Sequence, residues 1–168
     1  MEINFEVTKE DYIKFNLYHI ENSPFQRKNF NLLRYGIPVL FSFPIYFIGT
    51  GIFKQSSIYW SIISLLFVVI WIFSYPKQYK NLVKKQTEKL INEGDNSEIF
   101  GKKTMIIDDE NITIYNRSSF ERILKQSIKD VKIYDDIILI YTSSISAYII
   151  PIRYLDKDSE KFIYENLT

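Results

Sequence analysis

The sequence predicts an α+β membrane protein: two apolar helices form a transmembrane hairpin, and the rest of the chain forms an antiparallel sheet with a C-terminal helix. Two observations predict the hairpin. Residues 35–53 and residues 58–75 contain no charged side chain, and helices of these lengths reach about 27–28 Å, close to the thickness of the hydrocarbon core of a bilayer. A third observation predicts the sheet, because apolar and polar residues alternate with a period of two from residue 103 onward.

The polar break between the two apolar runs consists only of residues 54–57, which makes the two helices antiparallel neighbours. Pro44, in the interior of the first run, lacks the N–H that would bond to the carbonyl of Leu40, so we expect a kink there. The small residues at 49–51 are expected to allow close approach of the second helix, where Ser61 and Ser64 are also small.

Basic side chains predict the orientation of the hairpin. The intervening loop holds Lys54 alone, whereas residues 1–34 hold five basic side chains and residues 76–103 hold seven. By the positive-inside rule, both termini are therefore cytoplasmic and the protein is a two-span protein of the cell membrane. The basic residues nearest the membrane are candidates for contact with lipid headgroups; they are Arg27, Lys28, Arg34, Lys77, Lys80, Lys84 and Lys85.

Four segments follow from these patterns. Residues 1–34 contain a strand at Ile3–Val7 and an amphipathic helix over 9–21, which begins at an N-cap Thr8 and ends before Pro24. Residues 35–75 are the hairpin, residues 76–95 a basic juxtamembrane helix that ends near Gly94, and residues 103–168 the sheet domain, which the N-terminal strand joins.

Six further strands and a helix are predicted in the C-terminal part, which gives seven strands in one curved antiparallel sheet capped by a helix. Polar turns at 108–111 and 135–136 separate neighbouring strands, and Asp156 or Asp158 caps the helix. The predicted elements are Thr104–Ile107, Ile112–Asn116, Phe120–Lys125, Val131–Tyr134, Ile137–Thr142, Ile145–Ile152 and the helix Asp156–Leu167.

Several short motifs resemble the YcxB-like family of small bacterial membrane proteins. They are Phe5-Glu6-Val7-Thr8 with Asp11-Tyr12, then Asn16-Leu17-Tyr18-His19, the two close apolar runs, and the closing stretch Ala147-Tyr148-Ile149-Ile150-Pro151-Ile152-Arg153-Tyr154. The resemblance implies a membrane protein whose cytoplasmic part is a bacterial pleckstrin-homology-like sheet domain, without an established enzymatic activity.

No group of residues predicts catalysis, a cofactor or a metal site. The sequence has no cysteine and one histidine, His19, which we interpret as structural. The acidic runs 108–110 and 135–136 fit solvated turns better than cation sites. A nucleic-acid partner is not expected, because residues 104–168 carry eleven acidic and eight basic side chains.

The sequence favours a non-enzymatic membrane protein whose cytoplasmic domain mediates protein–protein interaction, self-association or assembly. Pro151, Arg153 and Tyr154 are the candidate partner-binding residues. Arg153 could anchor an acidic partner, but a rim position or a local salt bridge is the more common role of such a residue. Two alternatives remain: an immunity protein that protects the cell against a toxin or bacteriocin, and an accessory subunit of a transporter whose charged pathway lies in another chain.

Overall fold

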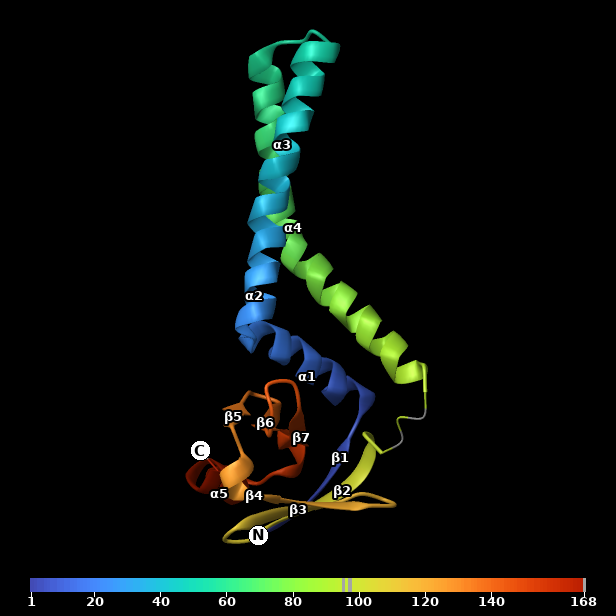
Figure 1. The fold of residues 1–168 in the computed structure, drawn as a ribbon, viewed down its shortest axis with the longest axis vertical. Coiled ribbons are helices and arrows are strands. Elements are labelled where there is room, and N and C mark those ends of the chain that lie inside the picture. The colour runs from blue at the N-terminus through green and yellow to red at the C-terminus, as the bar shows by residue number, and fades with distance from the viewer. Residues whose placement is uncertain (95, 97, 168) are drawn as a thin grey trace. The chain divides into compact units, whose positions relative to one another are not determined.

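The structure, a computed structural model, describes residues 1–94, 96 and 98–167. Asp95 and Thr168, which fall within predicted segments, and Ser97, which falls between two of them, lie outside the described residues. The chain divides into two compact units (Figure 1). The sheet unit comprises Met1–Asn16 and Gln86–Thr168, and the helical unit comprises Leu17–Lys85.

The sheet unit contains two antiparallel sheets rather than the single curved sheet that the sequence predicted. Four strands pair in the order β1-β2-β3-β4, and three pair in the order β5-β6-β7. The single-sheet prediction was wrong because periodicity reports strands and not their partners: the chain passes from β4 to β5 through a 3₁₀ turn, Lys125–Ser127, without continuing the ladder. The strands are β1 (Glu2–Val7), β2 (Gly101–Ile107), β3 (Asn111–Tyr115), β4 (Phe120–Leu124), β5 (Asp130–Ile133), β6 (Ile137–Tyr141) and β7 (Ala147–Pro151).

The N-terminal strand joins the sheet, as predicted. β1 pairs with β2 over its whole length, from Glu2 opposite Ile106 to Val7 opposite Gly101. The entire helical unit is therefore inserted between two strands that are hydrogen-bonded neighbours. Gly101 begins β2 with a φ of 91°, a left-handed conformation that glycine adopts without steric cost.

The core of the sheet unit lies between the two sheets. Ile3, Phe5 and Val7 of β1 alternate inward, while all five residues of β6 are buried. Full burial of β6 requires cover on its second face, and the start of α1 (Lys9–Asn22) contributes to it: the rings of Phe15 and Tyr141 lie 6.4 Å apart. The C-terminal helix α5 (Lys157–Leu167) closes the unit with Ile163, which is fully buried.

Local hydrogen bonds confirm both predicted helix caps in this unit. The hydroxyl of Thr8 accepts a bond from the backbone N–H of Asp11, while a carboxylate oxygen of Asp11 accepts one from the N–H of Thr8. This reciprocal pair satisfies two amides at the first turn of α1. At α5, Asp156 accepts a bond of 2.8 Å from the N–H of Ser159.

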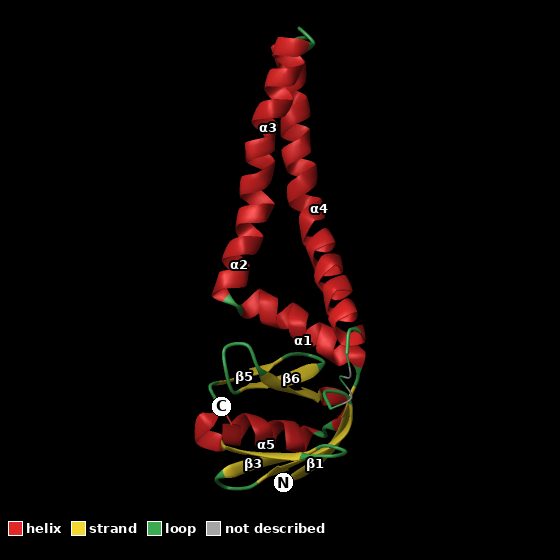
Figure 2. Ribbon diagram, turned by 45° about the vertical axis from the view of Figure 1, so that its right-hand side comes forward, coloured by secondary structure: helices red, strands yellow, loops and turns green. Residues whose placement is uncertain are grey.

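The helical unit contains two helices long and apolar enough to cross a membrane. They lie side by side near the short turn that joins them (Figures 1 and 2). Only 11% and 6% of their most apolar stretches are buried, unlike the core helices of a soluble protein. The first spans Pro24–Ile52, and the second is the helix α4 (Ser57–Asn92).

Both long helices differ in detail from the predicted spans. The first consists of α2 (Pro24–Asn31) and α3 (Ile37–Phe47), each followed by a π-helical turn, at Leu32–Gly36 and Ile48–Ile52. In α4, the predicted span and the predicted juxtamembrane helix form one uninterrupted helix with Pro76 inside it.

The expected close approach of the hairpin helices occurs at Gly49 but not at Gly51. A Cβ added to Gly49 would lie 1.9 Å from the ring of Trp60 on α4, so only glycine fits there. A Cβ on Gly51 would meet nothing within 4 Å, and the prediction for that residue was wrong. The partner of Gly49 is thus a large aromatic ring and not the small Ser61 or Ser64, because a missing side chain on one helix admits a flat one from the other.

Candidate functional site

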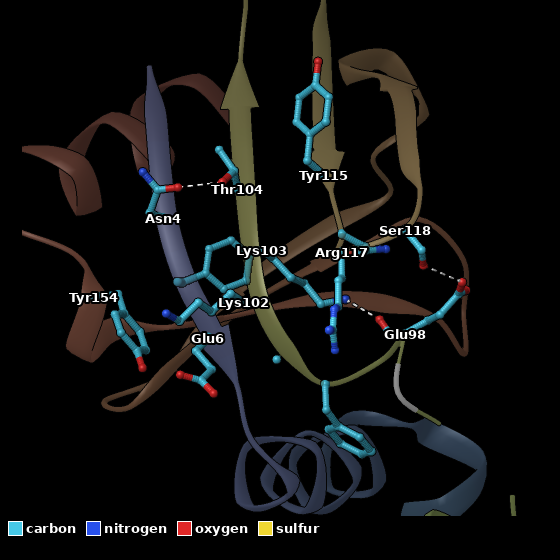
Figure 3. A pocket seen from close by; sticks show the side chains of 14 residues that line it. Asn4, Glu6, Glu98, Lys102, Lys103, Thr104, Tyr115, Arg117, Ser118 and Tyr154 are labelled. Atoms are coloured by element: carbon cyan, nitrogen blue, oxygen red, sulfur yellow. Dashed lines mark hydrogen bonds between the residues drawn. The ribbon is translucent and has the colours of Figure 1, made fainter. Parts of the chain in front are cut away.

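A hollow of about 1020 Å³ lies on the sheet unit beside the first residues of β2 (Figure 3). Its walls come from β1, β2, β3, the turn at 116–118, the segment 98–100 and Tyr154. Residues from both ends of the chain therefore build it, which follows from the pairing of β1 with β2.

The charged groups of the hollow are of mixed sign. Lys102, Lys103 and Arg117 line it together with Glu6 and Glu98. The ammonium of Lys103 donates a 2.9 Å bond to the backbone carbonyl of Glu98, and Figure 3 shows Arg117 on the same side of the hollow. Burial lowers the pKa of Lys103, although the carboxylates of Glu121 and Glu98 act in the opposite direction.

Lys103 also lines a second cavity, of about 380 Å³, that opens between the two sheets. Glu121 and Tyr148 face this cavity, and burial together with the hydrogen bond to Glu121 raises the pKa of the Tyr148 hydroxyl. The side-chain oxygen of Asn116 is buried and has no hydrogen-bond partner among the described residues. An unsatisfied acceptor of this kind is rare in folded proteins and marks a place where a ligand donor or a water can bind.

Ser118 is a hydroxyl residue of the hollow that lies next to a carboxylate of its lining. Its hydroxyl donates a 3.3 Å hydrogen bond to the exposed carboxylate of Glu98. Among the described residues that line the hollow there is no histidine that could act as the base for this serine. The hollow combines cations and carboxylates with the partly exposed rings of Tyr115 and Tyr154, residue types that are common in protein interfaces.

Of the three predicted partner-binding residues, two are occupied within the sheet unit. Pro151 is buried at the end of β7. Arg153 lies in the 3₁₀ turn Ile152–Tyr154, and its two terminal nitrogens donate to the two carboxylate oxygens of Asp11 at 2.7 and 2.6 Å. Of the roles considered for Arg153, the structure contains the local salt bridge.

The Arg153–Asp11 pair joins residues 142 positions apart. Asp11 is 1% exposed, so burial alone would raise the pKa of its carboxyl, but hydrogen bonds from Arg153 and Thr8 outweigh burial and leave that pKa below 3.8. Arg153 also donates to the backbone carbonyl of Glu6. The guanidinium therefore ties the end of the strand β7 to both β1 and the first turn of α1.

Tyr154, the third of these residues, is 42% exposed and lines the hollow. Its ring lies 5.0 Å from the guanidinium carbon of Arg153, so the salt bridge also orients this ring. Sequence reasoning missed the other residues of the hollow because Lys102, Glu98 and Arg117 are scattered along the chain and carry no motif.

The seven predicted lipid-contact residues separate into two groups. Arg27, Arg34 and Lys80 line one pocket of about 280 Å³ in the helical unit. The remaining four lie on exposed positions of α2 and α4 and line none of the described pockets; they are Lys28, Lys77, Lys84 and Lys85.

The acidic turns have different surroundings. Asp136 forms an ion pair with Lys14 of α1, at 2.5 Å, so the turn at 135–136 is not simply solvated. Residues 108–110 form an exposed turn between β2 and β3. No group of three or more His, Asp or Glu side chains within the described ranges could hold a metal ion.

Burial lowers the pKa of His19 below 6.5.

Neither a family model nor a curated protein nor a solved structure matches this chain. The resemblance to the YcxB-like family therefore stays a prediction from the sequence motifs.

Proposed function

We propose that this chain is a non-enzymatic integral membrane protein whose sheet unit, a pleckstrin-homology-like domain, binds a protein partner or a second copy at the inner face of the membrane. Seven antiparallel strands followed by a C-terminal helix support the domain assignment. The observation that carries the binding role is the mixed-charge, aromatic-lined hollow on the sheet unit.

The exposed apolar surface of the hairpin supports the membrane location. Phe43, Phe47, Ile62, Leu65 and Ile70 are between 54% and 65% exposed. Soluble proteins rarely expose contiguous apolar surface of this extent, whereas lipid covers it without cost. The basic residues that flank the hairpin on both sides, and their scarcity in the loop, support cytoplasmic termini.

The residue types in and beside the hollow support protein contact. Tyr115, Tyr154 and Arg117 belong to the types that dominate binding energy in protein interfaces. The patch continues onto β4, an edge strand of its sheet, where Phe120 is 66% exposed and its ring lies 6.0 Å from that of Tyr115. An exposed edge strand can also pair with a strand of another chain.

Photo-crosslinking in cells tests the binding role. A photoreactive residue in place of Tyr115 should form a crosslink to one protein. Lys102→Glu and Arg117→Glu reverse charges in the hollow and should strongly reduce the yield of this crosslink. Lys157→Glu, at an exposed site on α5 that does not line the hollow, is the matched control and should leave the crosslink unchanged. Equal crosslinking in all variants would refute binding through the hollow.

Single-cysteine labelling tests the topology. Since the sequence has no cysteine, one can be placed at Lys54, at Glu2 or at Lys161 without interference. A membrane-impermeant maleimide should label intact cells at position 54 only, and the other two positions after permeabilisation. Labelling at position 2 or 161 in intact cells would contradict cytoplasmic termini.

A further inference from the structure

The pocket of the helical unit combines cations with an apolar lining. Arg27, Arg34 and Lys80 supply positive charge, and Phe30, Pro76 and Tyr79 supply apolar walls. The rings of Phe30 and Tyr79 meet edge to face at 5.1 Å. At about 280 Å³, the pocket is near the lower limit of typical ligand pockets, about 300–1,000 Å³.

The positive charge of the pocket is only partly neutralised. Lys80 forms a 2.8 Å ion pair with Glu21, the one carboxylate of the lining. The guanidinium of Arg27 makes no hydrogen bond or ion pair with any described side chain. Two guanidinium charges therefore remain for a ligand.

Arg34 is held in place for such a ligand. It lies in the π-helical turn Leu32–Gly36, and its Nε donates a 3.1 Å bond to the backbone carbonyl of Ile72 on α4. Its guanidinium carbon lies 5.1 Å from the ring centre of Tyr35 and 6.0 Å from that of Phe30. Because Nε is used, the two terminal nitrogens remain to donate a bidentate pair to a phosphate.

The pocket lies at the level where both apolar runs end. Arg34 directly precedes the uncharged run 35–53, and Pro76 directly follows the run 58–75. Close to these two residues in the sequence, the apolar side chains of Leu33 and Phe73 are 39% and 78% exposed. A ligand that fills the pocket and also covers this surface must be anionic at one end and apolar at the other.

We propose that Arg27, Arg34 and Lys80 form a binding site for the headgroup phosphate of an anionic phospholipid, whose acyl chains lie on the exposed hairpin surface. This site rests on the proposed membrane location. It adds that three basic residues select a lipid, whereas the other basic residues only flank the membrane.

Native mass spectrometry of the full-length protein tests the site, with phosphatidylglycerol and phosphatidylcholine as competing lipids. The wild type should retain one phosphatidylglycerol in preference to phosphatidylcholine. Arg27→Gln with Arg34→Gln should weaken this binding about 30-fold, from about 1 kcal/mol per cation near a membrane surface. Lys28→Gln with Lys77→Gln removes the same amount of charge from exposed positions outside the pocket and should leave binding within about twofold.

Further variants and one extraction experiment distinguish failure of the lipid site from failure of the proposed membrane location. Arg27→Gln alone, at a residue without an internal ion pair, should weaken binding about fivefold without loss of folding, and Arg27→Lys should largely restore it. Equal effects of the two double variants, equal retention of both lipids, or displacement by millimolar inorganic phosphate would each overturn the site. Alkaline extraction is done in parallel: release of the wild type from membranes would refute the proposed membrane location, whereas retention without lipid selectivity would refute this site alone.

Discussion

The sheet unit and the helical unit place the same residue types in opposite environments. Ile138, Leu139 and Ile140 of β6 are fully buried, whereas Leu65, Leu66 and Ile70 of α4 are 64%, 53% and 65% exposed. The sheet unit buries its apolar side chains by itself. The helical unit cannot do so with two helices and needs an apolar environment supplied from outside.

Charged side chains differ between the units in a parallel way. In the sheet unit, Arg153 pairs with Asp11 and Lys14 with Asp136. In the helical unit, the cations of the pocket outnumber its single carboxylate. These two pairs neutralise charges within the sheet unit, whereas the pocket of the helical unit keeps an excess of cations that suits an anionic ligand.

The largest expected difference comes from the same truncation in both units. Leu139→Ala should destabilise the sheet unit by about 2–5 kcal/mol because it leaves a cavity in a packed core. Leu66→Ala should cost well under that amount, since no protein atoms surround that side chain fully. Pulse proteolysis in urea, on protein in mild detergent, measures both. Equal losses would mean that Leu66 is buried against another protein chain.

A charge in the hairpin should oppose insertion. Leu66→Arg, near the middle of the second apolar run, should make membrane insertion less favourable by about 2.5–3.5 kcal/mol, the cost of a central arginine. Glycosylation mapping of the inserted fraction measures this cost. Tyr115→Arg, on the half-exposed surface of the sheet unit, is the control and should leave insertion unchanged; no effect of Leu66→Arg would argue against a spanning helix.

Loss of the Arg153–Asp11 pair should have a smaller effect. Arg153→Ala removes two charged hydrogen bonds and leaves the Asp11 carboxylate buried with Thr8 alone, which should cost about 2 kcal/mol of unfolding free energy, given the partial exposure of Arg153. Arg153→Lys should fall between wild type and alanine, since lysine cannot make the bidentate pair. Urea midpoints followed by β-sheet circular dichroism test this order, and an alanine variant as stable as wild type would contradict it.

The smallest expected effect is on pH dependence. The pKa of Asp11 is lower in the folded protein than the value of about 3.9 in an unfolded chain, so its contribution is complete above that value and is lost as pH falls through the folded pKa. Stability should therefore decrease as the pH falls below about 3.9, with a slope of at most about 1.4 kcal/mol per pH unit from this group. Asp11→Asn should flatten this decrease in urea titrations at several pH values; an unchanged slope would assign it to other carboxyls.

Local features of the sequence predicted most of the elements. The strand at Ile3–Val7, the Thr8 and Asp156 caps, the helix end before Pro24 and the two long apolar helices all depend on neighbours within a few residues. The structure changed their bounds by a few residues at most in the sheet unit, because periodicity and capping are short-range properties.

The candidate sites could not be predicted in the same way. The resemblance motif drew attention to Arg153, but its carboxylate partner lies 142 residues away, so the sequence favoured a rim position or a local salt bridge without identifying Asp11. The pocket cations stood out only as members of a group of seven. Which of them converge depends on how α2 and α4 pair, as seen in the bond from Arg34 to Ile72.

By itself, the sequence determined where strands and helices form and that two helices are apolar enough to cross a membrane, since alternation and uncharged length are encoded residue by residue. Only the tertiary structure decided that the seven strands divide into two sheets, that Gly49 receives the Trp60 ring, and that Asp11 holds Arg153. These features depend on which distant surfaces meet, and side-chain shape and charge select that outcome only after the chain has folded.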